Sequence, residues 1–138
     1  MAAYNKFEQF VEDIAVGVHT SDTDQFTVAL CAAANAPVAA NSVLLDLVPI
    51  AYTNLGSRTL TTSTAAQTAG VYTQLFADLI LLAGGGAVAG FRYIVIYNDT
   101  PVAPADPLVA WYDYTSDLVL NDTESLTVDF TTSTYTIT

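Results

Sequence analysis

The stretch Phe91-Arg-Tyr-Ile-Val-Ile-Tyr97 decides the fold class of this chain. Aromatic and β-branched side chains dominate it, and these residue types favour extended backbone. Phe91, Tyr93 and Tyr97 alternate with Arg92 and the isoleucines, and Arg92 is the one charged position. Since both faces of the stretch are largely apolar, it predicts a strand buried inside the domain.

A second apolar run lies just before this strand. Residues 71–82 are apolar on both faces, which predicts a central strand. The glycines at 84–86 then favour a turn. We therefore expect residues 71–82 and 89–97 to pair as a β-hairpin.

Shorter strands are predicted on either side of this hairpin. Phe26 to Leu30 alternates as a half-buried strand does, and Pro49 places the apolar run 43–52 at an edge or a bulge. With about seven or eight strands in all, the chain is predicted to be mainly β, an antiparallel β-sandwich or barrel-like domain that covers residues 1–138. The other predicted strands are 108–114, 118–120, 126–130 and 133–138, and residues 58–64 could be an exposed strand followed by a loop.

The first residues follow a different period. Phe7, Phe10 and Ile14 recur at helical spacing with acidic residues between them, which predicts an amphipathic helix over residues 4–17. This helix would account for an N-terminal helical segment at residues 1–18. Its two aromatic residues predict firm docking, either on a partner subunit or, as we prefer, on the sheet of its own domain.

The charge of the chain restricts its partners. Fourteen acidic residues face only Lys6, Arg58 and Arg92, so the formal net charge is −11 at pH 7. Nucleic acids and anionic membranes attract clustered cations, and the sequence has no such cluster, so neither is expected as a partner. Charged residues are 12% of the chain, about half the usual share, which suits a protein packed against neighbours. The first residues are also not expected to form a signal peptide, because they lack an apolar segment.

Residues that carry chemistry are few. His19 is the sole histidine and Cys31 the sole cysteine. Cys31 lies in an apolar run, so a buried inert thiol is preferred over a nucleophilic pair with His19. The glycine-rich residues 84–90 include no lysine that would meet a phosphate, and no familiar catalytic motif occurs. We therefore expect neither enzyme activity nor a cofactor.

Carboxylates leave two alternatives open. Asp78 and Asp113 each lie in an apolar strand and are candidates for acid–base chemistry. The preferred interpretation is structural, with Asp78 paired to Arg92 across the predicted hairpin. Residues 22–24 and 122–124 each offer two acidic side chains to Ca²⁺, but they lack EF-hand spacing and are expected to be solvated loops without a metal.

The aromatic residues also allow two interpretations. Tyr93, Tyr97, Trp111, Tyr112 and Tyr114 lie on two predicted strands. They would suit a sugar-binding platform, or, as we prefer, core and subunit interface, where tyrosine and tryptophan are enriched. The candidate interface residues are Phe7, Phe10, Ile14, Tyr97, Trp111 and Tyr112.

Three segments of the sequence resemble a group of small tailed-phage proteins, which are generally described only as structural or hypothetical proteins. The likeness extends to residues 126–130 and so spans nearly the whole chain. It implies a role in the virion, with assembly in the host cytoplasm, and it implies no active-site residues. The segments are Met1-Ala-Ala-Tyr-Asn-Lys-Phe-Glu-Gln-Phe-Val-Glu-Asp13, Phe91-Arg-Tyr-Ile-Val-Ile-Tyr-Asn-Asp-Thr-Pro101 and Asp106-Pro-Leu-Val-Ala-Trp-Tyr-Asp-Tyr114.

Among virion proteins, capsid decoration proteins are commonly small, acidic, β-rich and trimeric. The chain matches them in size and charge, so we expect a homotrimer bound to the major capsid protein on the outside of the head shell. A tail-tube subunit is the alternative, although such subunits usually carry a long β-hairpin arm and a helix between strands. A fibre or receptor-binding tip is a third alternative.

Overall fold

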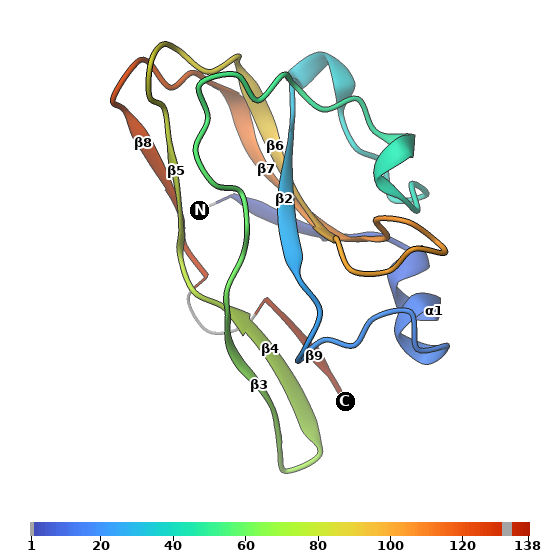
Figure 1. Ribbon diagram of the computed structural model, residues 1–138. Coiled ribbons are helices and arrows are strands. Elements are labelled where there is room, and N and C mark those ends of the chain that lie inside the picture. Colours follow the sequence, from blue (N-terminus) through green and yellow to red (C-terminus); the bar gives the residue numbers. More distant parts are fainter. Residues whose placement is uncertain (1, 131–133) are drawn as a thin grey trace.

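The computed structural model describes residues 2–130 and 134–138 (Figure 1). The fold is mainly β, with antiparallel sheets packed on one another and one short α-helix. This confirms the predicted fold class. Within the described residues the arrangement is sandwich-like and does not close into a barrel.

The first layer is a four-stranded antiparallel sheet. Beyond its last strand, the chain around Arg58 continues the ladder, because the Val28 amide donates to the Arg58 carbonyl oxygen at 2.9 Å. One edge of this sheet is therefore covered by its own chain. In order across the sheet, the strands are β1 (Ala3–Lys6), β7 (Leu108–Leu118), β6 (Phe91–Asn98) and β2 (Phe26–Cys31).

The second layer consists of two β-ribbons that follow one another along the chain. The backbone breaks at Ala77 and Asp78, where the Asp78 carboxylate accepts a hydrogen bond from the Phe130 amide at 2.8 Å. Asp78 thus ties the two ribbons together at their junction. One ribbon contains β3 (Thr62–Thr68), β4 (Val71–Phe76) and β9 (Tyr135–Ile137), and the other contains β5 (Leu79–Leu82) and β8 (Ser125–Val128).

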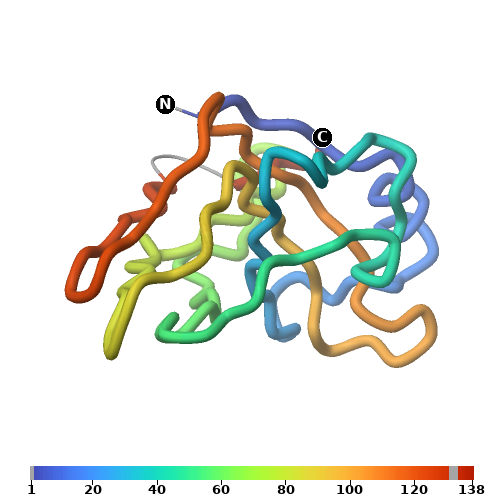
Figure 2. Tube along the Cα trace, turned by 90° about the horizontal axis from the view of Figure 1, so that it is seen from above, coloured from blue at the N-terminus to red at the C-terminus, as the bar shows by residue number. Residues whose placement is uncertain are grey.

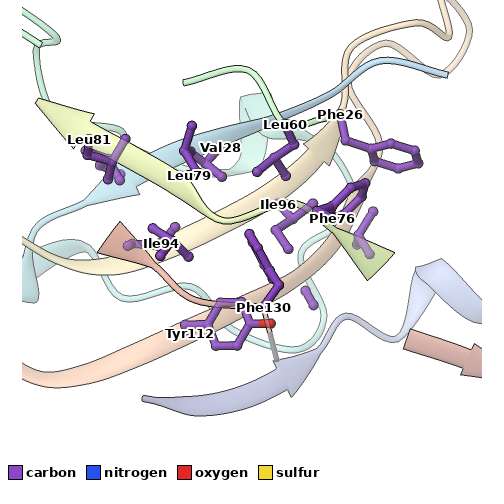
Figure 3. Close-up of a cluster of buried hydrophobic side chains, with 14 of the residues drawn as sticks. Phe26, Val28, Leu60, Phe76, Leu79, Leu81, Ile94, Ile96, Tyr112 and Phe130 are labelled. Atoms are coloured by element: carbon purple, nitrogen blue, oxygen red, sulfur yellow. The ribbon is translucent and has the colours of Figure 1, made fainter. Parts of the chain in front are cut away.

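The main hydrophobic core lies between these layers (Figure 3). Phe26 of the first layer meets Phe76 of the second with ring centroids 5.2 Å apart, and Phe76 meets Phe130 at 5.7 Å. Ile94 and Ile96 from β6 are fully buried in the same core. Alternate residues of the central strands therefore supply this contact between the layers.

A smaller core covers the opposite face of the first layer. The segment after β2 folds over this face through two 3-10 helices, η1 (Ala33–Asn35) and η2 (Leu44–Asp46). All six residues of β2 are consequently buried, so the prediction that this strand is half-buried was wrong. Burial on both faces also explains the largely apolar pattern of β6. The core residues on this side are Phe7, Ala29, Cys31, Leu47, Tyr93, Val95, Tyr97 and Leu108.

The N-terminal segment differs from its prediction. The helix α1 covers Gln9–Ala15 only, and the residues before it form β1. The ladder between β1 and β7 offers backbone partners, and the Phe7 amide donates to the Val109 carbonyl oxygen at 3.2 Å. These non-local hydrogen bonds outweigh the helical period of the sequence. Among the described residues, no helix has the length and apolar character needed to span a membrane.

The predicted hairpin between residues 71–82 and 89–97 is wrong. Residues 71–82 form two strands, β4 and β5, which belong to different ribbons. β5 pairs with β8, while β6 pairs with β2 and β7. The glycines at 84–86 lie in the segment that connects the two layers. A Cβ added at Gly86 would lie only 2.6 Å from the side-chain nitrogen of Asn54, so a larger residue would clash there.

Several shorter strands also differ in position from their predictions. Residues 43–52 contain η2 and an isolated bridge between Cys31 and Pro49 in place of a strand. β7 contains the strand predicted at 108–114 and continues to Leu118, so the separate strand predicted at 118–120 is wrong. The strand predicted at 58–64 overlaps β3 only at residues 62–64. At the C-terminus β9 confirms a strand, although Ser133 lies outside the described residues.

The core predicts a clear contrast between two isoleucines. Ile96 is 0% exposed and Ile80 is 60% exposed. Ile96→Ala is expected to lower the free energy of unfolding by about 2–5 kcal/mol, because it removes buried methyl groups and leaves a cavity. Ile80→Ala, the same change at the surface, should cost within about 0.5 kcal/mol. Urea unfolding followed by circular dichroism measures both, and equal losses would contradict this packing.

Candidate functional site

A groove separates the two layers where β1 faces β9. Tyr4 and Lys6 line one side of this groove, Tyr135 and Thr136 line the other, and Tyr112 contributes to its lining between them. The groove has a volume of about 530 Å³. We call it the seam. Figure 2 shows the two chain ends on the same side of the molecule.

The seam continues past the helix. A second groove of about 390 Å³ lies between α1 and β9, lined by Phe10, Val11 and Ile14 on one side and by Tyr135 and Ile137 on the other. Lys6 lines both grooves. The surface between β1, α1 and β9 is therefore one continuous, mainly apolar depression.

Two strand edges border the seam. Within the described residues β1 pairs with β7 alone and β9 pairs with β4 alone. Hydrogen-bonded and non-bonded pairs alternate along an antiparallel ladder, and the Phe7 amide bonds toward β7. By this alternation the backbone N–H and C=O groups of Tyr4 and Lys6 point away from β7. The edge of β1 is thus able to accept a further strand.

The seam is lined by phenol rings. The Tyr4 ring lies 5.5 Å from the Tyr112 ring, and Phe10 lies 5.0 Å from Tyr135. Burial raises the pKa of Tyr112 to about 12 and the pKa of Tyr135 to about 12. Burial also raises the pKa of Tyr4, and the neighbouring Tyr112 and Tyr135 add to the shift. These rings remain uncharged at physiological pH, so the lining is apolar apart from the phenol hydroxyls, of which that of Tyr135 donates to Ser21 Oγ at 2.6 Å.

The cations of the protein are distributed unevenly. Arg92 pairs with Asp113 at 2.8 Å, and the Arg58 guanidinium lies 3.7 Å from the centre of the Tyr52 ring. Lys6 forms no ion pair within residues 2–130 and 134–138. The rim of the seam therefore carries a positive charge on a protein whose net charge is −11.

A charge-free arm projects from the body of the domain. We give this name to residues 59–77, which include β3 and β4 and contain no charged residue. The turn at its tip has positive φ angles at Ala69 and Gly70, as a two-residue hairpin turn requires. Figure 1 shows this hairpin extending beyond the rest of the fold, and most β3 side chains are exposed.

The predicted interface residues mostly pack inside the domain. Phe7, Phe10, Tyr97 and Tyr112 are buried, and Trp111 is partly buried against the Phe7 ring at 4.6 Å. Their aromatic surface serves the two cores and leaves little for a partner. Of the six residues, Phe10, Ile14 and Tyr112 line the seam or its continuation beside α1.

The cluster of five aromatic residues is divided between the two faces of the first sheet. Tyr93, Tyr97 and Trp111 belong to the smaller core or pack against it. Tyr112 and Tyr114 face the main core. The five rings therefore do not form one flat platform of the kind a sugar would need.

The predicted ion pair between Asp78 and Arg92 is wrong. Arg92 instead forms two hydrogen bonds with Asp113 on the neighbouring strand, Nε to Oδ1 at 2.8 Å and Nη2 to Oδ2 at 3.1 Å. The strand break after β4 carries Asp78 away from β6, where it accepts the Phe130 amide. The Arg92 guanidinium holds the pKa of Asp113 below its usual value.

The two acidic turns act as caps for backbone amides. Asp24 accepts hydrogen bonds from the Thr20 amide at 2.7 Å and from the Asn98 side chain at 2.6 Å. Asp122 accepts the Gly85 amide, and Glu124 accepts the Asn121 amide. In the part of the chain that the structure describes, no group of three or more acidic, histidine or cysteine side chains is placed to hold a metal ion.

The two candidate nucleophilic residues lie in different surroundings. Cys31 is fully buried in the smaller core, which confirms the predicted buried thiol. Burial raises its pKa to about 11, so the reactive thiolate form is disfavoured. His19 packs against Phe10 and Phe26, with ring centroids 5.1 Å and 6.2 Å away.

A buried polar cluster surrounds His19, and sequence reasoning missed it. The Asn98 side-chain nitrogen lies 3.0 Å from His19 Nδ1 and also donates to Asp24. In the described residues, His19 Nε2 and Asp13 Oδ2 are buried without a hydrogen-bond partner. Burial lowers the pKa of His19, and the nearby Asp13 and Asp24 carboxylates partly oppose this shift.

The comparisons with known proteins found no relative. No family model matches the sequence, and no curated protein and no solved structure matches it. What the protein does must therefore follow from its own surface, charge and packing.

His19 predicts a pH dependence of stability. Because its pKa is lowered in the folded protein, the unfolded chain binds a proton more readily below the ordinary value of 6.5. The stability contributed by the neutral ring is present above this value and is lost as pH falls through it. The free energy of unfolding should therefore drop between about pH 7.5 and about pH 5.5.

The variant His19→Asn keeps an acceptor near the Asn98 side chain but does not titrate in this range. Its free energy of unfolding should change less with pH than that of the wild type. Chemical denaturation at both pH values gives the two slopes, and identical slopes would show that His19 contributes nothing to the pH dependence.

Proposed function

We propose that this chain is a structural protein of a tailed-phage particle, a capsid decoration protein that binds the major capsid protein on the outside of the head shell. The resemblance of its sequence to small tailed-phage proteins supports this role. Its small size, acidic charge and β fold agree with it.

A surface suited to adhesion is the observation that carries the proposal. Leu45 is 92% exposed and Val102 is 89% exposed, although both are apolar. The segments that hold them are joined, because the Leu44 amide donates to the Asp106 carbonyl oxygen at 3.0 Å. Leu45 and Val102, on these joined segments, define what we call the apolar corner. Grouped exposed apolar residues of this kind mark protein–protein contacts.

The charge distribution favours apolar adhesion over ion pairing. With three cations in the sequence, the protein has few groups that would pair with acidic residues of a shell. Burial of the apolar corner, helped by backbone hydrogen bonds, would supply the binding energy. A homotrimer would present three such corners at once and convert weak single contacts into strong attachment.

A tail-tube subunit is the second candidate, and two features support it. The helix α1 lies between β1 and β2, and the charge-free arm is a projecting β-hairpin. A helix between strands and a hairpin arm are both usual in tail-tube subunits. A fibre or receptor-binding tip has less support, because the aromatic residues that suggested it are divided between two faces.

The proposal predicts attachment that survives high salt. Particles washed in about 1 M salt should retain the protein, because screening weakens exposed charge pairs and leaves apolar contacts intact. Quantitative immunoblotting of washed, intact particles measures what remains. Release by salt alone would mean that the acidic surface binds a basic patch on the shell.

Two variants test which surface attaches. Leu45→Asp should reduce the amount of protein on the particle, because it places a charge in the apolar corner. Val119→Asp is the control, because Val119 is also exposed but follows the last residue of β7, Leu118. Immunogold labelling then distinguishes the two candidates: label on the head supports decoration, and label on the tail supports the tube.

A further inference from the structure

We propose that copies of this chain associate head to tail, with the β3 edge of one copy adding to the β1 edge of the next. The contact extends the four-stranded sheet of the acceptor copy and covers its seam. This inference is independent of the virion role, because it concerns the purified protein in solution.

The donor is the outer edge of β3. Within the described residues β3 pairs with β4 alone, and the pairs Thr68–Val71 and Ala66–Thr73 follow the two-residue turn. In such a hairpin the pair beside the turn is hydrogen-bonded, so by alternation the backbone groups of Ala65 and Gln67 face outward. Natural edge strands are usually protected by lysine, proline or an inward charge, and β3 contains none of these.

The acceptor is the outer edge of β1. There the outward backbone groups belong to Tyr4 and Lys6, which are two residues apart, as Ala65 and Gln67 are on β3. The two sets match in spacing, so the strands can align as an antiparallel ladder. The incoming ribbon would also cover the tyrosine rings of the seam, since Tyr4 is 41% exposed in the isolated chain.

Charge and free backbone groups favour these two edges over those of β8 and β2. Two copies with a net charge of −11 repel each other, so they can approach only through surfaces poor in acidic residues. The charge-free arm meets this condition, and the β1 edge carries Lys6. The edge of β8 is flanked by Glu124 and Asp129, and the edge of β2 is occupied by the chain at Arg58.

The geometry favours a head-to-tail contact over symmetric pairing of two β3 strands. A symmetric β3–β3 contact would leave the β1 edge and the seam uncovered in both copies. In the head-to-tail contact every copy uses one donor edge and one acceptor edge, so the contact repeats and can close into a ring.

Two proline variants test the contact. Ala65→Pro removes an outward N–H from the donor edge, and Lys6→Pro removes one from the acceptor edge, while neither N–H faces a strand within its own sheet. The controls Ala65→Thr and Lys6→Arg keep both N–H groups. By light scattering coupled to size exclusion, the wild type and both controls should be oligomers at about 0.1 mM, and each proline variant should be a monomer.

The decisive sample is the mixture of the two proline variants. Ala65→Pro retains its acceptor edge and Lys6→Pro retains its donor edge, so the mixture should form a one-to-one dimer and nothing larger. A monomeric wild type would overturn the proposal. So would a Lys6→Pro variant that still dimerises by itself, because that result indicates symmetric β3 pairing.

A cross-linking experiment decides the matter if a proline variant fails to fold by circular dichroism. Ala65→Cys protein is mixed with Lys6→Cys protein under mild oxidation, with the buried Cys31 unchanged. A disulfide between the two proteins, detected by mass spectrometry, is expected because paired strands bring such residues within bonding range. Cross-links only between identical variants would contradict the head-to-tail contact.

Discussion

Burial of the first sheet on both of its faces is the constraint on which the rest of the structure depends. β2 and β6 carry mainly apolar side chains on both faces, so folding is favourable only when both faces are removed from water. The two ribbons cover one face, and Phe7 and Leu47 help to cover the other. The path of the chain after β2, with its two 3-10 helices, follows from this requirement.

The burial of both sheet faces determines which surfaces are left to bind a ligand or a partner. Most large aromatic side chains are used in the cores, so they are not available for a ligand or a partner. The exposed regions include strand edges along the seam, the charge-free arm, and the apolar corner. All three are suited to contact with other proteins, which agrees with the structural role we propose.

The acidic charge limits the same surfaces. A protein with 14 acidic and three basic residues can assemble only where its own carboxylates are absent or held in other interactions. Asp24, Asp113 and Asp122 are held by hydrogen bonds to the protein itself. Assembly and attachment would then use different regions, the arm and the apolar corner, so both contacts can form at once.

The sequence by itself determined the mainly β class, the buried strand at residues 91–97, the buried thiol of Cys31 and a helix near Phe10. These follow from side-chain period and apolar content, which are local properties. The tertiary structure alone decided which strands pair, where α1 begins, and that Arg92 meets Asp113 while Asp78 caps the Phe130 amide. It also decided the seam, because β1 and β9 come from opposite ends of the chain. A local pattern determines whether a segment is extended and which of its faces is apolar. Backbone N–H and C=O groups are nearly the same in every strand, so they do not specify which strands pair. Pairing therefore depends on how all the segments pack together in the core.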